Sequence, residues 1–246
     1  MDVVEDFERA RAYAVRHPDH GRNRAGANLN MDPGRIRGWI NETSKPDLVR
    51  GLEYARERSW LNIHRGGQEQ SALAVLVAGL YACGGIAVNW VPAWTPETDR
   101  AHELITDALD ELAGGYTSRH EDSEKPTEFL PEDSPSVFGR VLVAYGAPQG
   151  DKNAESVTGL PEWLLDAPIT TRLPAVELFI LERGIYYDSK DTITLQCRNR
   201  RPAYRADLAA LIRSVTDGSV EAKANVVISA KAARELGFGR GDALRT

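Results

Sequence analysis

The stretch "VAGLYACGGI", residues 77–86, decides which fold this chain is expected to adopt. An apolar run leads into it from residue 72, and the pair Gly84–Gly85 follows. Continuous apolar residues that end in glycine predict a buried helix that stops at the pair. The run is short and interrupted by glycine, so it predicts a core helix rather than a membrane span.

From residue 69 onward the sequence shows one order of elements twice. In the first half, helix 69–82 precedes short strands within 86–95, a helix over about 97–113, the strand-like "YTSRHED" and "PTEFLP", and helix 135–145. In the second half, helix 174–183 precedes "GIYYD" and "DTITLQCR" around an "SKD" turn, helix 203–216, the strand "NVVIS" and a helix capped by Ser229. Two copies of an α-β-β-α-β-β-α order predict a duplicated α+β domain with pseudo-two-fold symmetry.

The first segment is expected to be helical throughout. Hydrophobic periodicity predicts helices over 3–17, 22–29 and 34–40, and a fourth helix that runs to about Ser59. Ser44 and Asp47 have the spacing of a capping box at the start of the fourth helix. The glycine-rich "HRGGQEQ" predicts a linker near residue 66. The expected parts are therefore a helical domain over 1–66, a first half with the connector over 67–165, and a second half with the tail over 166–246.

Residues 22–46, "RNRAGANLNMDPGRIRGWINETSKP", have the layout of a helix-turn-helix. Its apolar residues are expected to face inward, namely Ala25, Leu29, Ile36, Trp39 and Ile40. Polar residues at the exposed start of the second helix then reach base edges and phosphates. Nine basic and five acidic residues between Gly21 and Arg65 make this region locally positive. The expected DNA contacts are Arg22, Arg24, Arg35 and Arg37; the alternative is a small helical cap whose arginines only solvate its surface.

Residues 77–85, "VAGLYACGG", are similar to the LAGLIDADG motif of homing endonucleases. Val77 to Leu80 match its first four positions, and Gly85 matches its final glycine. The resemblance extends over residues 69–236, with "LPAVELFILERGIYY" in place of the second motif helix. The order of elements matches the family better than the motif letters do. The whole chain also resembles a group of LAGLIDADG-like proteins with a helix-turn-helix from salt-loving archaea.

The resemblance implies two motif helices packed across a pseudo-two-fold axis, with close approach at the small residues Ala78, Gly79 and Ala82. It also implies two curved antiparallel sheets that sit as a saddle on duplex DNA. Side chains alternate between the faces of a strand. The DNA-facing set of the second half is then Thr192, Thr194, Gln196 and Arg198, or the set displaced by one, with Tyr186, Arg200 and Arg201 nearby. The first-half candidates are Asn89, Thr117, Arg119, Thr127 and Glu128; the alternative is that exposed sheet faces are simply polar.

A cleaving member of this family needs a carboxylate at the end of each motif helix. Paired carboxylates hold the divalent metals that activate water for phosphodiester cleavage. In this chain Gly84 stands at the first acidic position and Arg183 at the second, with Glu182 one residue earlier. Glycine offers no ligand atom and arginine repels a metal. We therefore expect no catalytic residue, no bound metal and no cofactor.

Composition adds limits of its own. The net charge of −6 argues against nucleic acid, but basic residues cluster in 21–65 and in "CRNRRPAYR" at 197–205. Six of the 30 basic residues are lysine, and low lysine with excess acid favours a salt-adapted, halophilic source. Two cysteines make no disulfide framework and the start shows no signal-peptide pattern, so a cytoplasmic protein is expected.

These observations predict a sequence-specific double-stranded DNA-binding protein, a transcriptional regulator derived from a homing endonuclease and lacking nuclease activity. Two half-sites on one chain favour a monomer or a weak homodimer, with no membrane partner. Two alternatives stay open. One is a metal-dependent homing endonuclease that uses Glu182 and an unrecognised acid, and the other is an RNA- or protein-binding module on the same fold.

Overall fold

The computed structural model of the chain describes residues 2–121, 124–187 and 190–241. The chain forms two compact units, Met1–Leu61 and Asn62–Thr246. The helical unit thus ends at Leu61 rather than at residue 66. Each unit has its own buried core.

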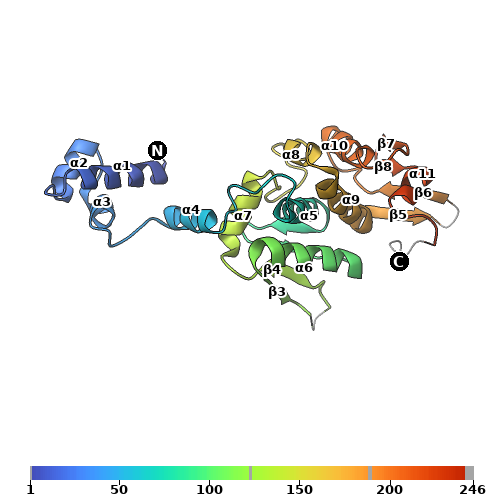
Figure 1. Cartoon of the computed structure of the whole chain (residues 1–246), viewed down its shortest axis with the longest axis horizontal. Coiled ribbons are helices and arrows are strands. Elements are labelled where there is room, and N and C mark those ends of the chain that lie inside the picture. The colour runs from blue at the N-terminus through green and yellow to red at the C-terminus, as the bar shows by residue number, and fades with distance from the viewer. Residues whose placement is uncertain (1, 122–123, 188–189, 242–246) are drawn as a thin grey trace. The chain divides into compact units, whose positions relative to one another are not determined.

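The first unit contains four helices among its described residues. They are α1 (Val3–Arg16), α2 (Arg22–Leu29), α3 (Pro33–Ile40) and α4 (Asp47–Glu57) (Figure 1). Carboxylates begin two of them. Asp2 accepts a hydrogen bond from the backbone N–H of Val4 (2.9 Å), and Asp32 accepts one from that of Arg35 (2.8 Å). The expected helices over 3–17, 22–29 and 34–40 are confirmed.

The start of α4 differs from the expected capping box. Pro46 is the N-cap residue, and no side chain caps the helix. Ser44 turns back on α3, where its backbone N–H donates to the Gly38 carbonyl (3.3 Å). Because Ser44 precedes the cap and is bonded to α3, it does not satisfy the free N–H groups of the first turn. The capping-box prediction is therefore wrong.

Side chains from all four helices form the core of the first unit. Phe7 of α1 meets Trp39 of α3 edge to face, with ring centroids 5.8 Å apart, a favoured aromatic geometry. Ala25 and Ile36 are fully buried. Leu29 and Ile40, also expected to face inward, are partly buried and pack against this core.

The second unit mixes helices with two antiparallel sheets. Its first half runs through α5 (Gln68–Ala82), β1 (Gly84–Ile86), β2 (Pro92–Trp94), α6 (Asp99–Ala113), β3 (Tyr116–Arg119), β4 (Glu128–Pro131) and α7 (Pro135–Ala144). Thr98 caps α6 by accepting the backbone N–H of Ala101 (3.2 Å). Gly114 ends that helix in the left-handed conformation (φ 78°), a conformation that favours glycine.

The connector and the second half add α8 (Glu162–Leu165), α9 (Ile169–Arg183), β5 (Gly184–Tyr187), β6 (Lys190–Leu195), α10 (Pro202–Arg213), β7 (Val220–Ala222), β8 (Val226–Ile228) and α11 (Ala230–Glu235). α9 begins at Ile169, earlier than the expected residue 174, so Pro174 lies inside the helix. Proline inside a helix removes one backbone N–H and is disfavoured, which is why the sequence predicts a start at residue 174. Ser189 of the expected "SKD" turn lies outside the described residues.

The strands of both sheets follow the same order relative to the chain, β1-β2-β4-β3 and β5-β6-β8-β7. Every pairing is antiparallel. Helices pack on these sheets: α6 contacts β3 and β4, and α9 and α11 contact β6. The fold is therefore of the α+β class.

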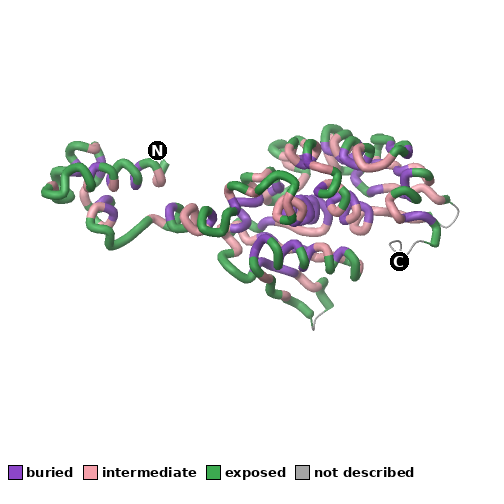
Figure 2. Tube along the Cα trace, in the orientation of Figure 1, coloured by how far each residue is buried: buried purple, intermediate pink, exposed green. Residues whose placement is uncertain are grey.

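α5 and α9 pack against each other in the second unit (Figure 1). Residues 72–82 of α5 are all buried, and Figure 2 shows buried residues gathered along this helix pair. A helix that is apolar on all sides must be surrounded by protein, and α6, α9 and the first sheet surround it. No helix within the described ranges has both the length and the apolar character that crossing a membrane requires.

Gly79 of α5 makes a different contact from the expected one. A Cβ at this residue would lie 2.7 Å from Trp94 Cδ1 and 2.8 Å from Ile105 Cδ1. Trp94 of β2 also donates its indole N–H to the Leu76 carbonyl (3.0 Å). Gly79 thus makes room for the sheet and helix of its own half. The expectation that it serves the contact with the second motif helix is wrong.

Candidate nucleic-acid interface

All four arginines expected to contact DNA from the first unit are exposed, and three of them have no partner among the described residues. Arg22 and Arg24 lie in the first turn of α2, and Arg37 lies on α3. Within the described residues their guanidinium groups have no hydrogen bond or ion pair. Each therefore keeps all five N–H donors for another partner.

Arg35 has a structural contact instead. Its Nη1 lies 3.0 Å from Asp6 Oδ2 on α1, and the Asp6 side chain is fully buried. Its guanidinium also lies 5.1 Å from the ring centroid of Trp39. A buried carboxylate needs a cation beside it, and Arg9 supplies only a longer second contact of 3.5 Å. Arg35 thus forms an ion pair that joins α1 and α3, and its DNA contact stays a prediction.

The turn between α2 and α3 is tight because residue 26 is glycine. A Cβ there would lie 2.8 Å from the Met31 carbonyl oxygen and 2.9 Å from Pro33 Cγ. Asn30 ends α2 in the left-handed conformation (φ 55°), which asparagine tolerates better than most residues. Local sequence therefore sets the geometry that presents the arginines of α2 and α3.

The burial pattern of β6 decides which of its two alternating sets faces outward. Ile193, Leu195 and, just beyond the strand, Cys197 are buried. Alternation then places Thr192, Thr194, Gln196 and Arg198 on the opposite face, where Gln196 and Arg198 are exposed. The first of the two expected sets is the outward one.

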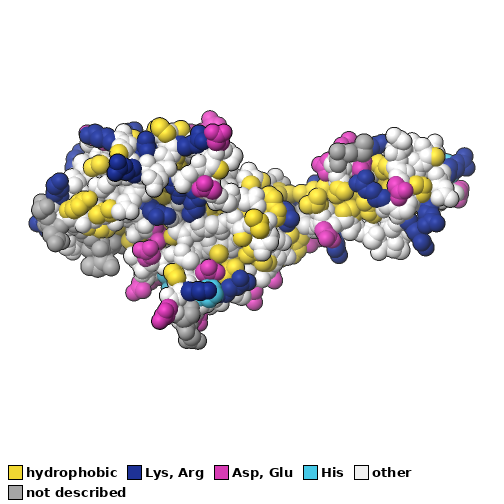
Figure 3. Space-filling model, turned by 180° about the vertical axis from the view of Figure 1, so that it is seen from behind, with side chains coloured by type: hydrophobic (Ala, Val, Ile, Leu, Met, Phe, Trp, Pro, Cys, Tyr) yellow, Lys and Arg dark blue, Asp and Glu magenta, His cyan; other side chains and the backbone are white. Residues whose placement is uncertain are grey.

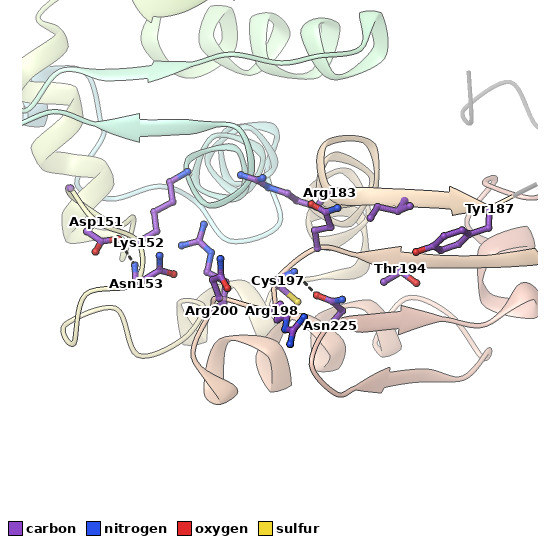
Figure 4. Close-up of a pocket in the computed structure, with 14 residues that line it drawn as sticks. Asp151, Lys152, Asn153, Arg183, Tyr187, Thr194, Cys197, Arg198, Arg200 and Asn225 are labelled. Atoms are coloured by element: carbon purple, nitrogen blue, oxygen red, sulfur yellow. Dashed lines mark hydrogen bonds between the residues drawn. The ribbon is translucent and has the colours of Figure 1, made fainter.

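Four of the residues expected to contact DNA from the second half line one cleft of about 580 Å³ (Figure 4). These are Thr194, Gln196, Arg198 and Arg200. The cleft is also lined by Gly150, Asp151, Lys152, Asn153, Arg183, Ile185, Tyr187, Cys197, Asn199 and Asn225. Among these described residues four are cations and one is a carboxylate, so the cleft is electropositive.

Three of the cations converge on the C-terminal end of α5. The carbonyl of Tyr81 accepts hydrogen bonds from Arg200 Nη2 (3.0 Å) and Lys152 Nζ (3.5 Å). Arg183 Nη2 donates to the carbonyl of Ala82. Carbonyls at a helix C-terminus carry partial negative charge, which helps the fold to hold three like charges together. Figure 4 shows Lys152 and Arg200 extending toward this helix end.

This crowding changes the acidity of the cations. Burial, and then the charges of Arg200 and Arg183, lower the pKa of Lys152 to about 8. Burial also lowers the pKa of Arg200, with Arg183 contributing. Nη1 of Arg200 is buried without a hydrogen-bond partner among the described residues. The cleft therefore holds more positive charge than its own groups neutralise.

The strand ladders show which residues correspond at the ends of α5 and α9. The backbone N–H of Thr95 donates to the Cys83 carbonyl, and that of Gln196 donates to the Arg183 carbonyl, both at 2.9 Å. Cys83, rather than Gly84, is thus the counterpart of Arg183, and the expected pairing is corrected by one residue. Gly84 itself has no space for a side chain, because a Cβ there would lie 2.5 Å from the Ala93 carbonyl oxygen.

Glu182 and Cys83 lie at these helix ends. The Glu182 carboxylate accepts the backbone N–H of Glu97 (3.0 Å), and burial raises its pKa. Burial and the Glu182 carboxylate raise the pKa of the Cys83 thiol, which keeps it protonated and unreactive. In the part of the chain that the structure describes, no three His, Cys, Asp or Glu side chains gather closely enough to hold a metal ion.

Two other expected residues lie outside the cleft. Arg201 Nη2 lies 3.7 Å from Glu155 Oε1. Arg119 is exposed on β3, an edge strand of the first sheet, and is paired across the ladder with Glu128. Figure 3 shows Lys and Arg side chains on the drawn face of both units.

Sequence reasoning missed Lys152, Asn153 and Asn225. The first two lie in the polar run "GDKN" of the connector, and the third lies between β7 and β8. Asn225 holds the cleft wall in place, because its Oδ1 accepts the backbone N–H of Cys197 (3.1 Å). A lysine in the connector of a lysine-poor chain could have marked Lys152 as a candidate functional residue. The neighbouring sequence, however, does not indicate that this lysine contacts the end of α5.

No protein-family model matches this chain, and no curated protein matches it. Among solved structures, the chain is similar to the crystal structure of the N-terminal LAGLIDADG domain of DUF199/WhiA. That similarity has a TM-score of 0.38 and 11% sequence identity, over 70% of this chain and 81% of that chain. Family membership therefore stays a resemblance, and the function has to be inferred from the chain's own residues.

Proposed function

We propose that this protein binds double-stranded DNA sequence-specifically without cleaving it and that it acts as a transcriptional regulator. The observation that carries this proposal is the cationic cleft at the ends of α5 and α9. Arg183, Lys152 and Arg200 hold positive charge there, whereas cleavage in the resembled family needs paired carboxylates. Positive side chains attract a phosphodiester backbone and repel a divalent cation.

The same strand order in both sheets supports the proposal that the second unit is a duplicated domain with pseudo-two-fold symmetry. On this proposal each sheet meets one half of the DNA site through its outward face. In the second half Thr194 and Gln196 offer hydrogen-bonding groups for base edges, and Arg198 offers a guanidinium for a guanine or a phosphate. In the first half Arg119 lies at the sheet edge.

The helix-turn-helix proposal rests on α2, α3 and the tight turn between them, which packs against Gly26 of α2. Their exposed arginines, Arg22, Arg24 and Arg37, suit phosphate and major-groove contacts. Phosphate contacts position a protein on DNA, whereas base contacts supply specificity. In this proposal the first unit therefore contributes affinity through phosphates and recognition through the major groove, and the sheets add further recognition.

Fluorescence anisotropy with fragments of the source genome tests DNA binding. We expect salt-sensitive binding with one preferred site. Arg198→Ala is expected to weaken binding about tenfold and, if Arg198 contacts a phosphate, to reduce the slope of log affinity against log salt by about 1. Arg234→Ala is the matched control, because Arg234 is exposed on α11, which packs on β6. Equal losses for both variants, or no salt-sensitive binding, would contradict the proposal.

A second assay tests the absence of cleavage. The protein is incubated with Mg²⁺ or Mn²⁺ and a plasmid that carries its own gene and flanking DNA. We expect the plasmid to stay intact, because Glu182 is bonded to the Glu97 N–H and lies beside Arg183. Specific cuts would establish the endonuclease alternative, and tighter binding of structured RNA than of duplex DNA would favour an RNA-binding module.

A further inference from the structure

Lys152, Arg183 and Arg200 reach one place from three separate segments of the chain. Lys152 comes from the connector, Arg183 ends α9, and Arg200 lies between β6 and α10. Each uses one donor on a carbonyl at the end of α5. An ammonium has three N–H donors and a guanidinium has five, so most donors of the cluster have no acceptor among the residues that the structure describes.

The nearby carboxylates do not neutralise this cluster. Asp151 accepts the backbone N–H of Asn153 (2.9 Å), and Glu182 accepts that of Glu97. Glu155 pairs with Arg201, outside the cleft. Among the described residues, no carboxylate forms an ion pair with Lys152, Arg183 or Arg200. Partly buried charges without a counter-charge are unfavourable, and a bound anion removes that cost.

We propose that Lys152, Arg183 and Arg200 form a phosphate-binding site at the end of α5. Planar guanidinium groups donate paired hydrogen bonds to phosphate oxygens, and an ammonium adds a point charge. The buried, unpartnered Nη1 of Arg200 gains an acceptor when the phosphate binds. The phosphate belongs either to the DNA backbone, in which case the site rests on the proposed function, or to a free phosphate compound.

Proton uptake accompanies binding at this site. The groups that face Lys152 are Arg183 from α9, Arg200 from the loop before α10 and the protonated Cys83 at the end of α5, with Asp151 beside it in the connector. Because Lys152 has a pKa of about 8 without ligand, its ammonium is largely lost by pH 9, and an anion restores it. Affinity for an anion therefore falls as pH rises through 8.

Calorimetric titration of the full-length protein tests the site, with sodium phosphate as ligand and sodium chloride at equal ionic strength as reference. We expect saturable binding of phosphate only. Lys152→Met is expected to weaken it at least tenfold, Lys152→Arg to retain it, and Lys231→Met, an exposed lysine on α11, to leave it unchanged. No saturable phosphate binding by the unaltered protein, or equal affinity in Lys152→Met, would overturn the proposal.

Sulfate serves for the pH series, because it does not titrate near neutral pH. We expect the affinity of the unaltered protein to fall about tenfold from pH 7 to pH 9, and that of Lys152→Arg to stay constant. A fall of the same size in Lys152→Arg would overturn the role of Lys152.

Competition with duplex DNA identifies the source of the phosphate. Displacement of DNA by phosphate, together with weaker DNA binding in Lys152→Met, assigns the site to the backbone. Phosphate binding that leaves DNA affinity unchanged assigns it to a free phosphate compound. If the protein binds no DNA at all, the proposed function fails while the phosphate titration still reports on this site.

Discussion

At the scale of the residue, Gly84 stands where the motif of the resembled family carries an acid, and it has no room for a side chain. Its missing side chain has a steric reason, since the Ala93 carbonyl and the Trp94 ring occupy that space. The neighbouring Gly85 has no atom within 4 Å of an added Cβ. Two adjacent glycines of one short strand therefore differ completely in what they tolerate.

Gly84→Asp is expected to destabilise the protein by about 2–4 kcal/mol, because the new side chain displaces backbone, and to confer no metal-dependent cleavage. Urea denaturation followed by circular dichroism measures the first effect, and the plasmid assay measures the second. Gly85→Asp is the control and should cost less than about 1 kcal/mol. Equal stabilities of the two variants would show that the strand yields at Gly84.

Lys152 links stability to pH. Its folded-state pKa of about 8 lies below the unfolded value of 10.5, so folding disfavours the ammonium. The resulting destabilisation is fully present below pH 8 and is relieved as pH rises from 8 toward 10.5. At pH 7 and low phosphate, Lys152→Met should be more stable than the unaltered protein by about 1–2 kcal/mol, after allowance for solvent screening.

The difference in unfolding free energy between these two proteins, measured by urea denaturation from pH 7 to pH 10, should stay constant up to about pH 8 and shrink above it. The comparison cancels the titration of other groups, such as Tyr81, whose pKa burial raises to about 12. A difference that stays constant with pH would contradict the inferred acidity of Lys152.

At the scale of the element, α3 separates two arginines that look alike in sequence. Arg35 compensates the buried carboxylate of Asp6, whereas Arg37 is exposed and unpaired within the described residues. Helical periodicity predicts that both side chains lie on the outer side of α3. It indicates only the direction in which a side chain leaves its own helix and not which distant residue it meets. The partner of Arg35 lies on another helix, far away in the sequence.

Arg35→Ala is expected to destabilise the first unit by about 2 kcal/mol, because it leaves the Asp6 charge with only the longer Arg9 contact. Arg37→Ala should leave stability within about 0.5 kcal/mol and weaken DNA binding. Thermal unfolding and anisotropy together measure the contrast. In the double variant Asp6→Asn/Arg35→Ala, most of the Arg35 effect should disappear; additive losses would argue against the ion pair.

At the scale of the whole molecule, two sheets with the same strand order lie in one chain. We expect a monomer of 27.1 kDa in solution and one chain per duplex, because the two half-sites proposed for one chain would remove the need for a partner copy. Sedimentation velocity with and without a DNA fragment measures both stoichiometries. A complex that forms only with two chains per duplex would show that each chain supplies a single half-site.

The sequence by itself determined the features that depend on neighbouring residues. Helix periodicity, the Ser229 cap and the alternation along β6 act over a few residues and appear in the structure as expected. It missed β7, which is too short to show a period, and it began α9 late because of Pro174.

Tertiary structure alone decided the outward set of β6, the contact of Gly79 with Trp94 and the pairing of Arg35 with Asp6. It also brought Lys152, Arg183 and Arg200 together at the end of α5, because long-range packing sets which distant charges meet and no local pattern records it.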